Sequence, residues 1–171
     1  MKLDYNHLLP ADFSDNSRVW IYQSNRLFQM SEALQIEDMI NSFVDSWNTH
    51  GSPVKGFGTL FFGRFVVLIA DETQAGVSGC STDSSVRLIK EIESRFGVSM
   101  FDRNLLAFYV KDSIQLIPLN QFNYAFEHGI LSRDTIYFNN LVPTLSELKN
   151  NWLIPAGASW LGRRFNALKS A

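Results

Sequence analysis

The residues best suited to chemistry lie in one stretch, residues 77–87, which reads Val-Ser-Gly-Cys-Ser-Thr-Asp-Ser-Ser-Val-Arg. It holds the only cysteine of the chain, and it joins a strongly apolar run to an amphipathic pattern. A strand that enters a helix through such a turn leaves backbone N–H groups unpaired at the helix N-terminus, where an anion or a thiolate is stabilised. The predicted ligand-binding residues are Ser78, Gly79, Cys80, Ser81, Thr82, Asp83, Ser84 and Arg87.

Two interpretations of this stretch are open. In one, hydroxyl and N–H groups converge on a phosphate or carboxylate beside Arg87. In the other, a single residue caps the helix and Arg87 pairs with Asp83 one turn earlier. Cys80, the only candidate for catalysis, is either a thiolate of lowered pKa or a small buried side chain whose pKa burial raises. We expect the buried form.

Two short patterns carry a resemblance. Residues 65–72, Phe-Val-Val-Leu-Ile-Ala-Asp-Glu, resemble the Walker B pattern of ABC-type ATPases, and residues 77–81 resemble their signature motif. The chain as a whole is similar to a family of small uncharacterised bacterial proteins, some of which carry the label ABC transporter ATPase. The sequence contains no Gly-x-x-x-x-Gly-Lys-[Ser/Thr], so the loop and the lysine that hold a triphosphate are missing. We therefore expect no ATP hydrolysis.

The composition limits the classes of function. A chain of 171 residues with 46% hydrophobic content is large enough for one core. Fifteen basic and 17 acidic residues give a net charge of -2, which would attract neither nucleic acid nor an anionic membrane. One cysteine and three histidines supply neither an internal disulfide nor a zinc motif. We expect a cytoplasmic protein without metal or cofactor, since a single thiol suits a reducing compartment.

Two amphipathic patterns predict the helices that position the stretch. The first covers residues 32–49, with Ser31 as its N-cap. The second begins within residues 81–84 and ends at Gly97. A short third helix is predicted after Thr144, which has capping-box spacing to Glu147.

Runs of β-branched and aromatic residues predict the strands. The second run contains a continuous apolar segment, residues 65–70, which is typical of a central strand covered on both faces. The predicted strands are residues 18–28, residues 56–72 as one bent strand or two that meet near Gly63, a hairpin of residues 105–110 and 114–119, and residues 135–138.

This order of elements predicts an α+β fold with helices packed on a mainly antiparallel sheet, ferredoxin-like with additions; a three-layer α/β sandwich is the alternative. Residues 1–17 form a loose lead-in, residues 18–152 a single domain, and residues 153–171 an irregular tail. The tail is basic and aromatic, so it either docks on its own domain or contacts a protein partner or an acidic ligand.

The sequence thus predicts a non-enzymatic binding or interaction module with a small anionic ligand at residues 78–87. A thiol-dependent enzyme or redox sensor that uses Cys80 is the alternative. Trp20, Tyr22 and Arg26 alternate along the first predicted strand, and they either line a pocket or belong to an aromatic core.

Overall fold

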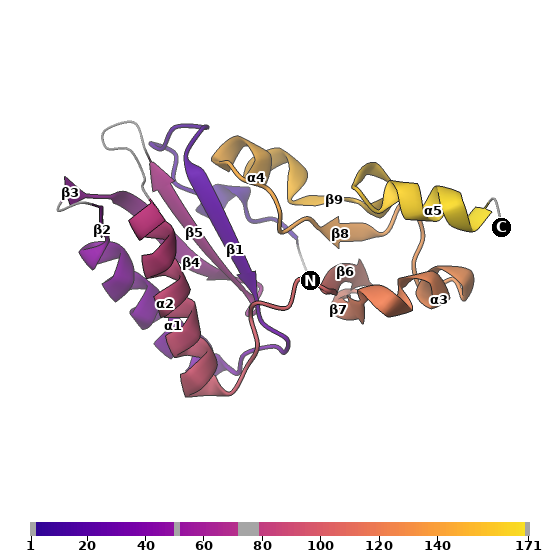
Figure 1. The fold of residues 1–171 in the computed structure, drawn as a ribbon, viewed down its shortest axis with the longest axis horizontal. Helices are drawn as coiled ribbons and strands as arrows, with labels where there is room; N and C mark the ends of the chain where they lie inside the picture. Colours follow the sequence, from indigo (N-terminus) through magenta and orange to yellow (C-terminus); the bar gives the residue numbers. More distant parts are fainter. Residues whose placement is uncertain (1–2, 50–51, 72–78, 170–171) are drawn as a thin grey trace.

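The computed structural model describes residues 3–49, 52–71 and 79–169. The chain forms an elongated molecule with an antiparallel sheet in each half (Figure 1). The first sheet has the strand order β1-β5-β4 and the second the order β7-β6-β8-β9, with a two-stranded β2-β3 ribbon beside the first. The predicted α+β class, helices packed on antiparallel sheets, is confirmed.

The first sheet is built around β5 (Phe65–Asp71), whose seven residues are all buried between β1 (Arg18–Gln23) and β4 (Lys55–Phe61). Alternate residues of a strand point to opposite faces, so the continuous apolar run fills two cores at once. The run 56–72 is therefore two strands rather than one. They meet at a tight turn in which Phe62 and Gly63 have φ values of 53° and 60°.

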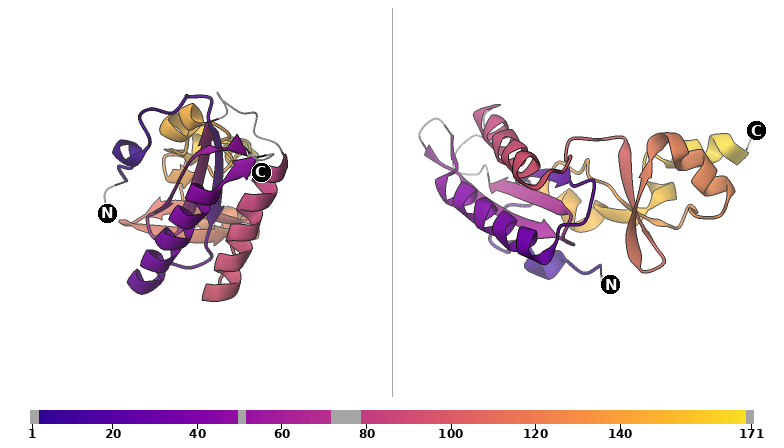
Figure 2. Two further views of the ribbon diagram at one scale, coloured as in Figure 1. Left: turned by 90° about the vertical axis from the view of Figure 1, so that its left-hand side faces the viewer. Right: turned by 90° about the horizontal axis from the view of Figure 1, so that it is seen from below.

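Helices α1 (Met30–Ser46) and α2 (Gly79–Phe96) cover one face of this sheet (Figures 1 and 2). The N-cap predicted at Ser31 is wrong: Gln29 caps α1 and forms a capping box with Glu32. Helix α2 also begins earlier than predicted, at Gly79, so its hydroxyl-rich residues lie inside the first turns and not before them. Its predicted end at Gly97 is confirmed, where φ is +62°.

The capping box of α1 should make the stability of the folded protein depend on pH. Arg26 donates to both carboxylate oxygens of Glu32 at 2.7 and 2.8 Å, and the Gln29 N–H donates at 2.8 Å. These hydrogen bonds lower the pKa of Glu32 from its ordinary 4.5 to about 2. A lowered folded-state pKa contributes stability that is present above the unfolded-state pKa and is lost as the pH falls from 4.5 through about 2.

We therefore expect Glu32→Gln to lower the urea midpoint of unfolding at pH 6, and the difference from the unmodified protein to shrink steadily between pH 5 and pH 2. Glu91→Gln, at an exposed position of α2, is the control and should show no such trend. A difference for Glu32→Gln that stays constant down to pH 2 would contradict the assignment.

The second sheet contains β6 (Leu105–Val110), β7 (Ser113–Pro118), β8 (Ile136–Phe138) and β9 (Leu153–Pro155). The predicted β6-β7 hairpin is confirmed, and its two-residue turn has φ values of 49° at Lys111 and 60° at Asp112. The order β1-α1-β4-β5-α2 follows a ferredoxin-like fold up to this point. The next strand, β6, then opens the second sheet instead of pairing with the outer edge of β1.

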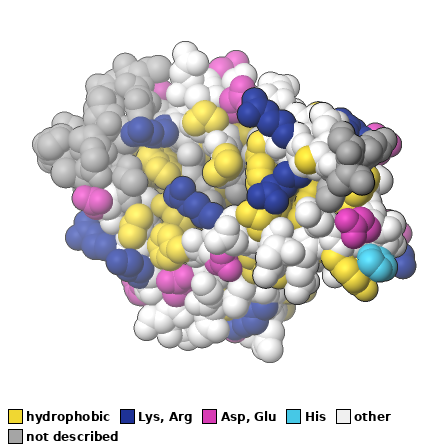
Figure 3. All heavy atoms as spheres, turned by 45° about the vertical axis from the view of Figure 1, so that its right-hand side comes forward, with side chains coloured by type: hydrophobic (Ala, Val, Ile, Leu, Met, Phe, Trp, Pro, Cys, Tyr) yellow, Lys and Arg dark blue, Asp and Glu magenta, His cyan; other side chains and the backbone are white. Residues whose placement is uncertain are grey.

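Only the first half of that outer edge is covered. The Val19 N–H donates to the Pro143 carbonyl at 3.0 Å, and the Leu145 N–H donates to the Ser17 carbonyl at 2.9 Å. No described strand pairs with the rest of this edge. Hydrophobic side chains, with Lys and Arg side chains beside them, reach the surface in the middle of the face that Figure 3 shows.

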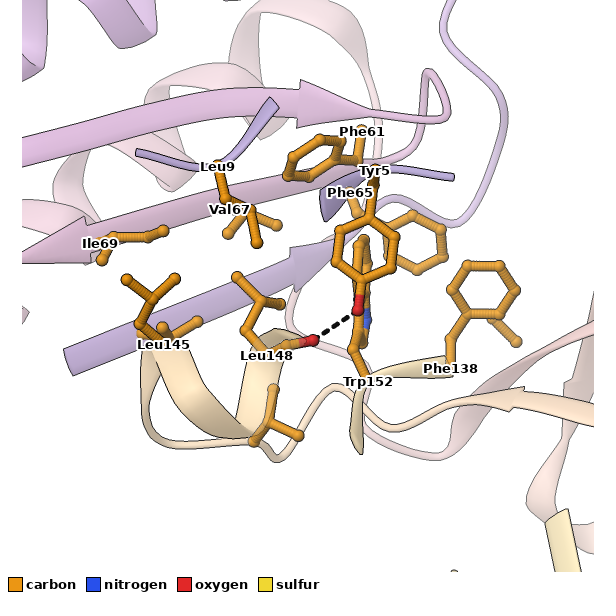
Figure 4. Close-up of a cluster of buried hydrophobic side chains, with 13 residues drawn as sticks. Tyr5, Leu9, Phe61, Phe65, Val67, Ile69, Phe138, Leu145, Leu148 and Trp152 are labelled. Atoms are coloured by element: carbon orange, nitrogen blue, oxygen red, sulfur yellow. Dashed lines mark hydrogen bonds between the residues drawn. The ribbon is translucent and has the colours of Figure 1, made fainter. Parts of the chain in front are cut away.

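The other face of the first sheet is covered by α4 (Leu145–Asn151) and the N-terminal segment (Figure 4). The predicted capping of α4 is confirmed, since Thr144 Oγ1 accepts the Glu147 N–H at 3.2 Å. The described part of the lead-in is not loose: Tyr5 and Leu9 are buried in this core. Tyr5 donates its hydroxyl to the Leu148 carbonyl, and burial raises its pKa to about 12.

Residues 153–171, for which the sequence predicts an irregular tail, contain β9 and α5 (Gly162–Lys169). Leu161 and Phe165 are fully buried, and Phe165 packs edge-on against Phe122 of α3 (Phe122–Glu127) at 5.0 Å. The segment is regular because these apolar side chains complete the core of the second sheet. The remaining short elements are η1 (Asn6–Leu8), β2 (Asn48–Thr49), β3 (Ser52–Pro53), η2 (Leu119–Gln121) and η3 (Ala156–Ala158).

Candidate ligand-binding cleft

The residues of the predicted anion site lie at the start of α2. Ser78 is outside the described residues, and for Gly79, Cys80, Ser81 and Thr82 the structure describes the backbone alone. The predictions about the Cys80 thiol therefore fall outside the described part of the protein. The three remaining residues, Asp83, Ser84 and Arg87, have described side chains.

Ser84 and Arg87 line an open groove between α1 and α2. Arg87 donates to Ser84 Oγ at 3.1 Å, and within the described residues no ion pair joins it to Asp83. The groove carries charges of both signs, with Asp38 and Glu91 beside the arginines, and it therefore has no net positive field to attract an anion.

A more enclosed hollow of about 350 Å³ lies where the two sheets meet, and we call it the inter-sheet cleft. Its walls are the end of β1, the loop between α2 and β6, parts of β6 and β8, and three side chains from later turns. Most of the lining is apolar or aromatic, including Ile21, Met100, Phe101, Leu106, Phe138 and Leu141. Such a lining at a junction of sub-structures is typical of small-molecule sites.

The uncovered half of β1 forms one edge of the cleft. In an antiparallel strand every second residue turns its N–H and C=O to the same edge. Val19 uses this edge to contact Pro143, so Ile21 and Gln23 present their backbone groups to it as well. On this outer edge no described strand pairs with β1 beyond the Arg18–Thr144 bridge, which leaves the stretch from Ile21 to Gln23 facing the cleft.

The floor of the cleft is a chain of hydrogen bonds that ties the two halves together. Trp152 Nε1 donates to Asn140 Oδ1 at 3.0 Å, Asn140 Nδ2 donates to Gln23 Oε1 at 2.9 Å, and Gln23 Nε2 donates to the Leu105 carbonyl at 2.8 Å. Gln23 is buried, so its two bonds are shielded in part from water and are costly to break. These bonds join lining residues of the first sheet to lining residues of the second half.

One wall connects the cleft to the predicted hydroxyl-rich cluster. The Tyr22 hydroxyl lies 2.9 Å from Ser85 Oγ, and the Tyr22 ring packs edge-on against Phe101 at 5.7 Å. Burial raises the pKa of Tyr22, while the hydrogen bond to Ser85 and the charge of Arg103 oppose that rise. Tyr22 keeps its hydroxyl proton at neutral pH.

Of Trp20, Tyr22 and Arg26, which the sequence places either in a pocket or in an aromatic core, one lines the cleft. Tyr22 lines the inter-sheet cleft. The Trp20 ring instead packs against Trp47 at 5.7 Å, and Arg26 lies beyond β1 in its ion pair with Glu32.

The opposite wall carries the polar groups that the sequence did not reveal. Trp160 Nε1 donates to the hydroxyl oxygen of Tyr137 at 3.2 Å, and burial raises the pKa of Tyr137. Because that oxygen is an acceptor here, its own proton remains to be donated, and no described residue accepts it. Arg103 is exposed at the rim, with neither an ion pair nor a hydrogen-bond partner among the described side chains.

Nothing in the sequence around Arg103, Tyr137 and Asn140 sets them apart, since none of them belongs to a recognisable motif. Trp160 had one signal, its place in the aromatic and basic C-terminal segment. These residues become a site only because β1, β6 and β8 meet in space.

Among the described residues, no three His, Cys, Asp or Glu side chains are grouped so that they could hold a metal ion. None of the described helices combines the length and the apolar character needed to cross a membrane. Comparison with protein-family models, with curated proteins and with solved structures gives no match.

Proposed function

We propose that this chain is a non-enzymatic binding domain and that it holds a small ligand in the inter-sheet cleft. The observation that carries the proposal is the combination of an apolar lining with a hydrogen-bonded floor formed by Gln23 and Asn140, which Trp152 supports from behind the lining. The volume of about 350 Å³ lies at the lower end of the range for ligand sites, which is roughly 300–1,000 Å³.

The titratable groups favour binding over catalysis. The described residues that line the cleft include no His, Cys, Lys or Glu. Burial moves the pKa of both Tyr22 and Tyr137 upward, away from neutrality. A general base or nucleophile works best with a pKa near the working pH, and none of these groups meets that condition.

The proposal is tested by titrating isotope-labelled protein with indole, a neutral aromatic probe, and following backbone amide shifts. We expect the shifts to gather on residues 21–23, 100–107 and 137–141. Leu141→Ala should weaken binding by about threefold to tenfold, because it removes part of the apolar wall.

Leu34→Ala is the matched control, since Leu34 and Leu141 are both 62% exposed and Leu34 lies on α1, outside the cleft. The control should bind indole like the unmodified protein. Absence of binding, or shifts centred on another surface, would contradict the proposal.

A further inference from the structure

On the basis of the proposed function, we infer that the ligand of the inter-sheet cleft is a compact aromatic carboxylic acid that binds as a monoanion. The inference depends on the polar groups that face the cleft, on the charges at its rim and on its size.

The side-chain groups with unused hydrogen-bonding capacity in the cleft are mostly donors. Arg103 has five N–H groups and no hydrogen-bond or ion-pair partner among the described residues. Tyr137 accepts from Trp160 and keeps its own proton to donate. Gln23 and Asn140 each use one amide hydrogen within the floor and have a second one available. A ligand that satisfies this set must present acceptors.

The charges at the rim favour one negative charge on the ligand. Among the described residues that line the cleft, Arg103 is the only cation. Arg164 lies outside the lining, with its guanidinium carbon 5.9 Å from the centre of the Trp160 ring. The acidic residue that the described part of the lining contains is Asp102, which is exposed and accepts the Asn104 N–H at 2.9 Å. A planar guanidinium matches a carboxylate with two parallel hydrogen bonds. A dianion would bring a second charge into a mostly apolar site without a cation dedicated to it.

The size and lining favour an aromatic body. Tyr22, Phe101 and Trp160 contribute rings to the walls, and aromatic rings pack well edge-on or offset against one another. Phe101 and Trp160 are 40% and 41% exposed, so both present ring surface that a ligand would cover. A single ring with a short acidic side chain suits a cleft of about 350 Å³.

The test compares 3-phenylpropionate with its uncharged amide, 3-phenylpropanamide, and with phenyl phosphate, by calorimetry at low salt and by amide shifts. We expect the acid to bind at least about tenfold more tightly than the amide, as one charge-assisted pair provides. Arg103→Gln should remove that preference while leaving the affinity for the amide unchanged. Arg163→Gln, an exposed arginine of α5 outside the cleft, should change neither affinity.

The outcomes separate the two proposals. Equal affinity for the acid and the amide would overturn the carboxylate inference and leave the cleft as a binding site. Tighter binding of phenyl phosphate than of the acid would overturn the monoanion. Binding of none of the three probes, together with no binding of indole, would overturn the proposed function itself. Arg103 is exposed and makes no described contact that folding needs, so its variant reports on binding alone.

Discussion

Replacing Trp152 by alanine is expected to lower the free energy of unfolding by about 3–5 kcal/mol, as for other large aromatic side chains deleted from a core. Trp152 is fully buried, and its ring lies between side chains from three parts of the chain (Figure 4). The ring centroids are 4.7 Å from Tyr5 of the N-terminal segment, 5.5 Å from Phe65 of β5 and 5.8 Å from Phe138 of β8. Alanine would leave a cavity at the point where these three parts of the chain meet.

Urea unfolding followed by circular dichroism measures this loss. Trp160→Ala is the control, because Trp160 is 41% exposed and its removal opens no closed cavity. Trp152→Phe should have an intermediate effect, since it keeps most of the apolar volume but leaves Asn140 Oδ1 without its donor. An alanine variant of Trp152 that is no less stable than that of Trp160 would contradict the central place of Trp152 in this core.

The second large effect is expected at Gly58 of β4, where α1 crosses the sheet closely. A Cβ atom at this position would lie 2.5 Å from Ile40 Cγ2 and 2.9 Å from Leu68 Cδ2. Both neighbours are fully buried, so neither can move aside freely. We expect Gly58→Ala to lower the free energy of unfolding by about 1–3 kcal/mol through overpacking.

A double-mutant cycle checks the cause. Ile40→Ala removes the closest atom, so Gly58→Ala should cost clearly less in the Ile40→Ala background than alone. Equal costs in the two backgrounds would show that the clash with Ile40 is not the reason. Thermal or urea unfolding of the four proteins supplies the measurement.

Several elements could be predicted because their causes are local. The apolar run 65–70 can be satisfied only by a strand that is covered on both faces, and β5 is that strand. The spacing of Thr144 and Glu147 specifies a helix start whichever surface the helix packs on. The β6-β7 hairpin follows from two apolar runs that are separated by a short polar turn.

The predicted starts of α1 and α2 were wrong because several neighbouring residues could serve as the N-cap. Ser31 has the side chain of a typical N-cap, but Gln29 takes the position because the Glu32 carboxylate, held by Arg26, accepts the Gln29 N–H. Arg26 comes from the end of the preceding segment, so the choice depends on how that segment turns back. At α2 the small hydroxylated residues of the first turns suit a cap and a helix interior alike, and α2 begins before them, at Gly79.

The sequence by itself determined the class of the fold, the central strand and the amphipathic helices, since period and capping act over a few residues. Only the tertiary structure decided that β6 does not pair with the outer edge of β1 but belongs to a second sheet. This second sheet gives the C-terminal segment regular structure and creates the inter-sheet cleft. The residues of the cleft come from positions 21 to 160. No local pattern joins them, because strand pairing is chosen by the total burial of both sheets and not by the sequence of either strand alone.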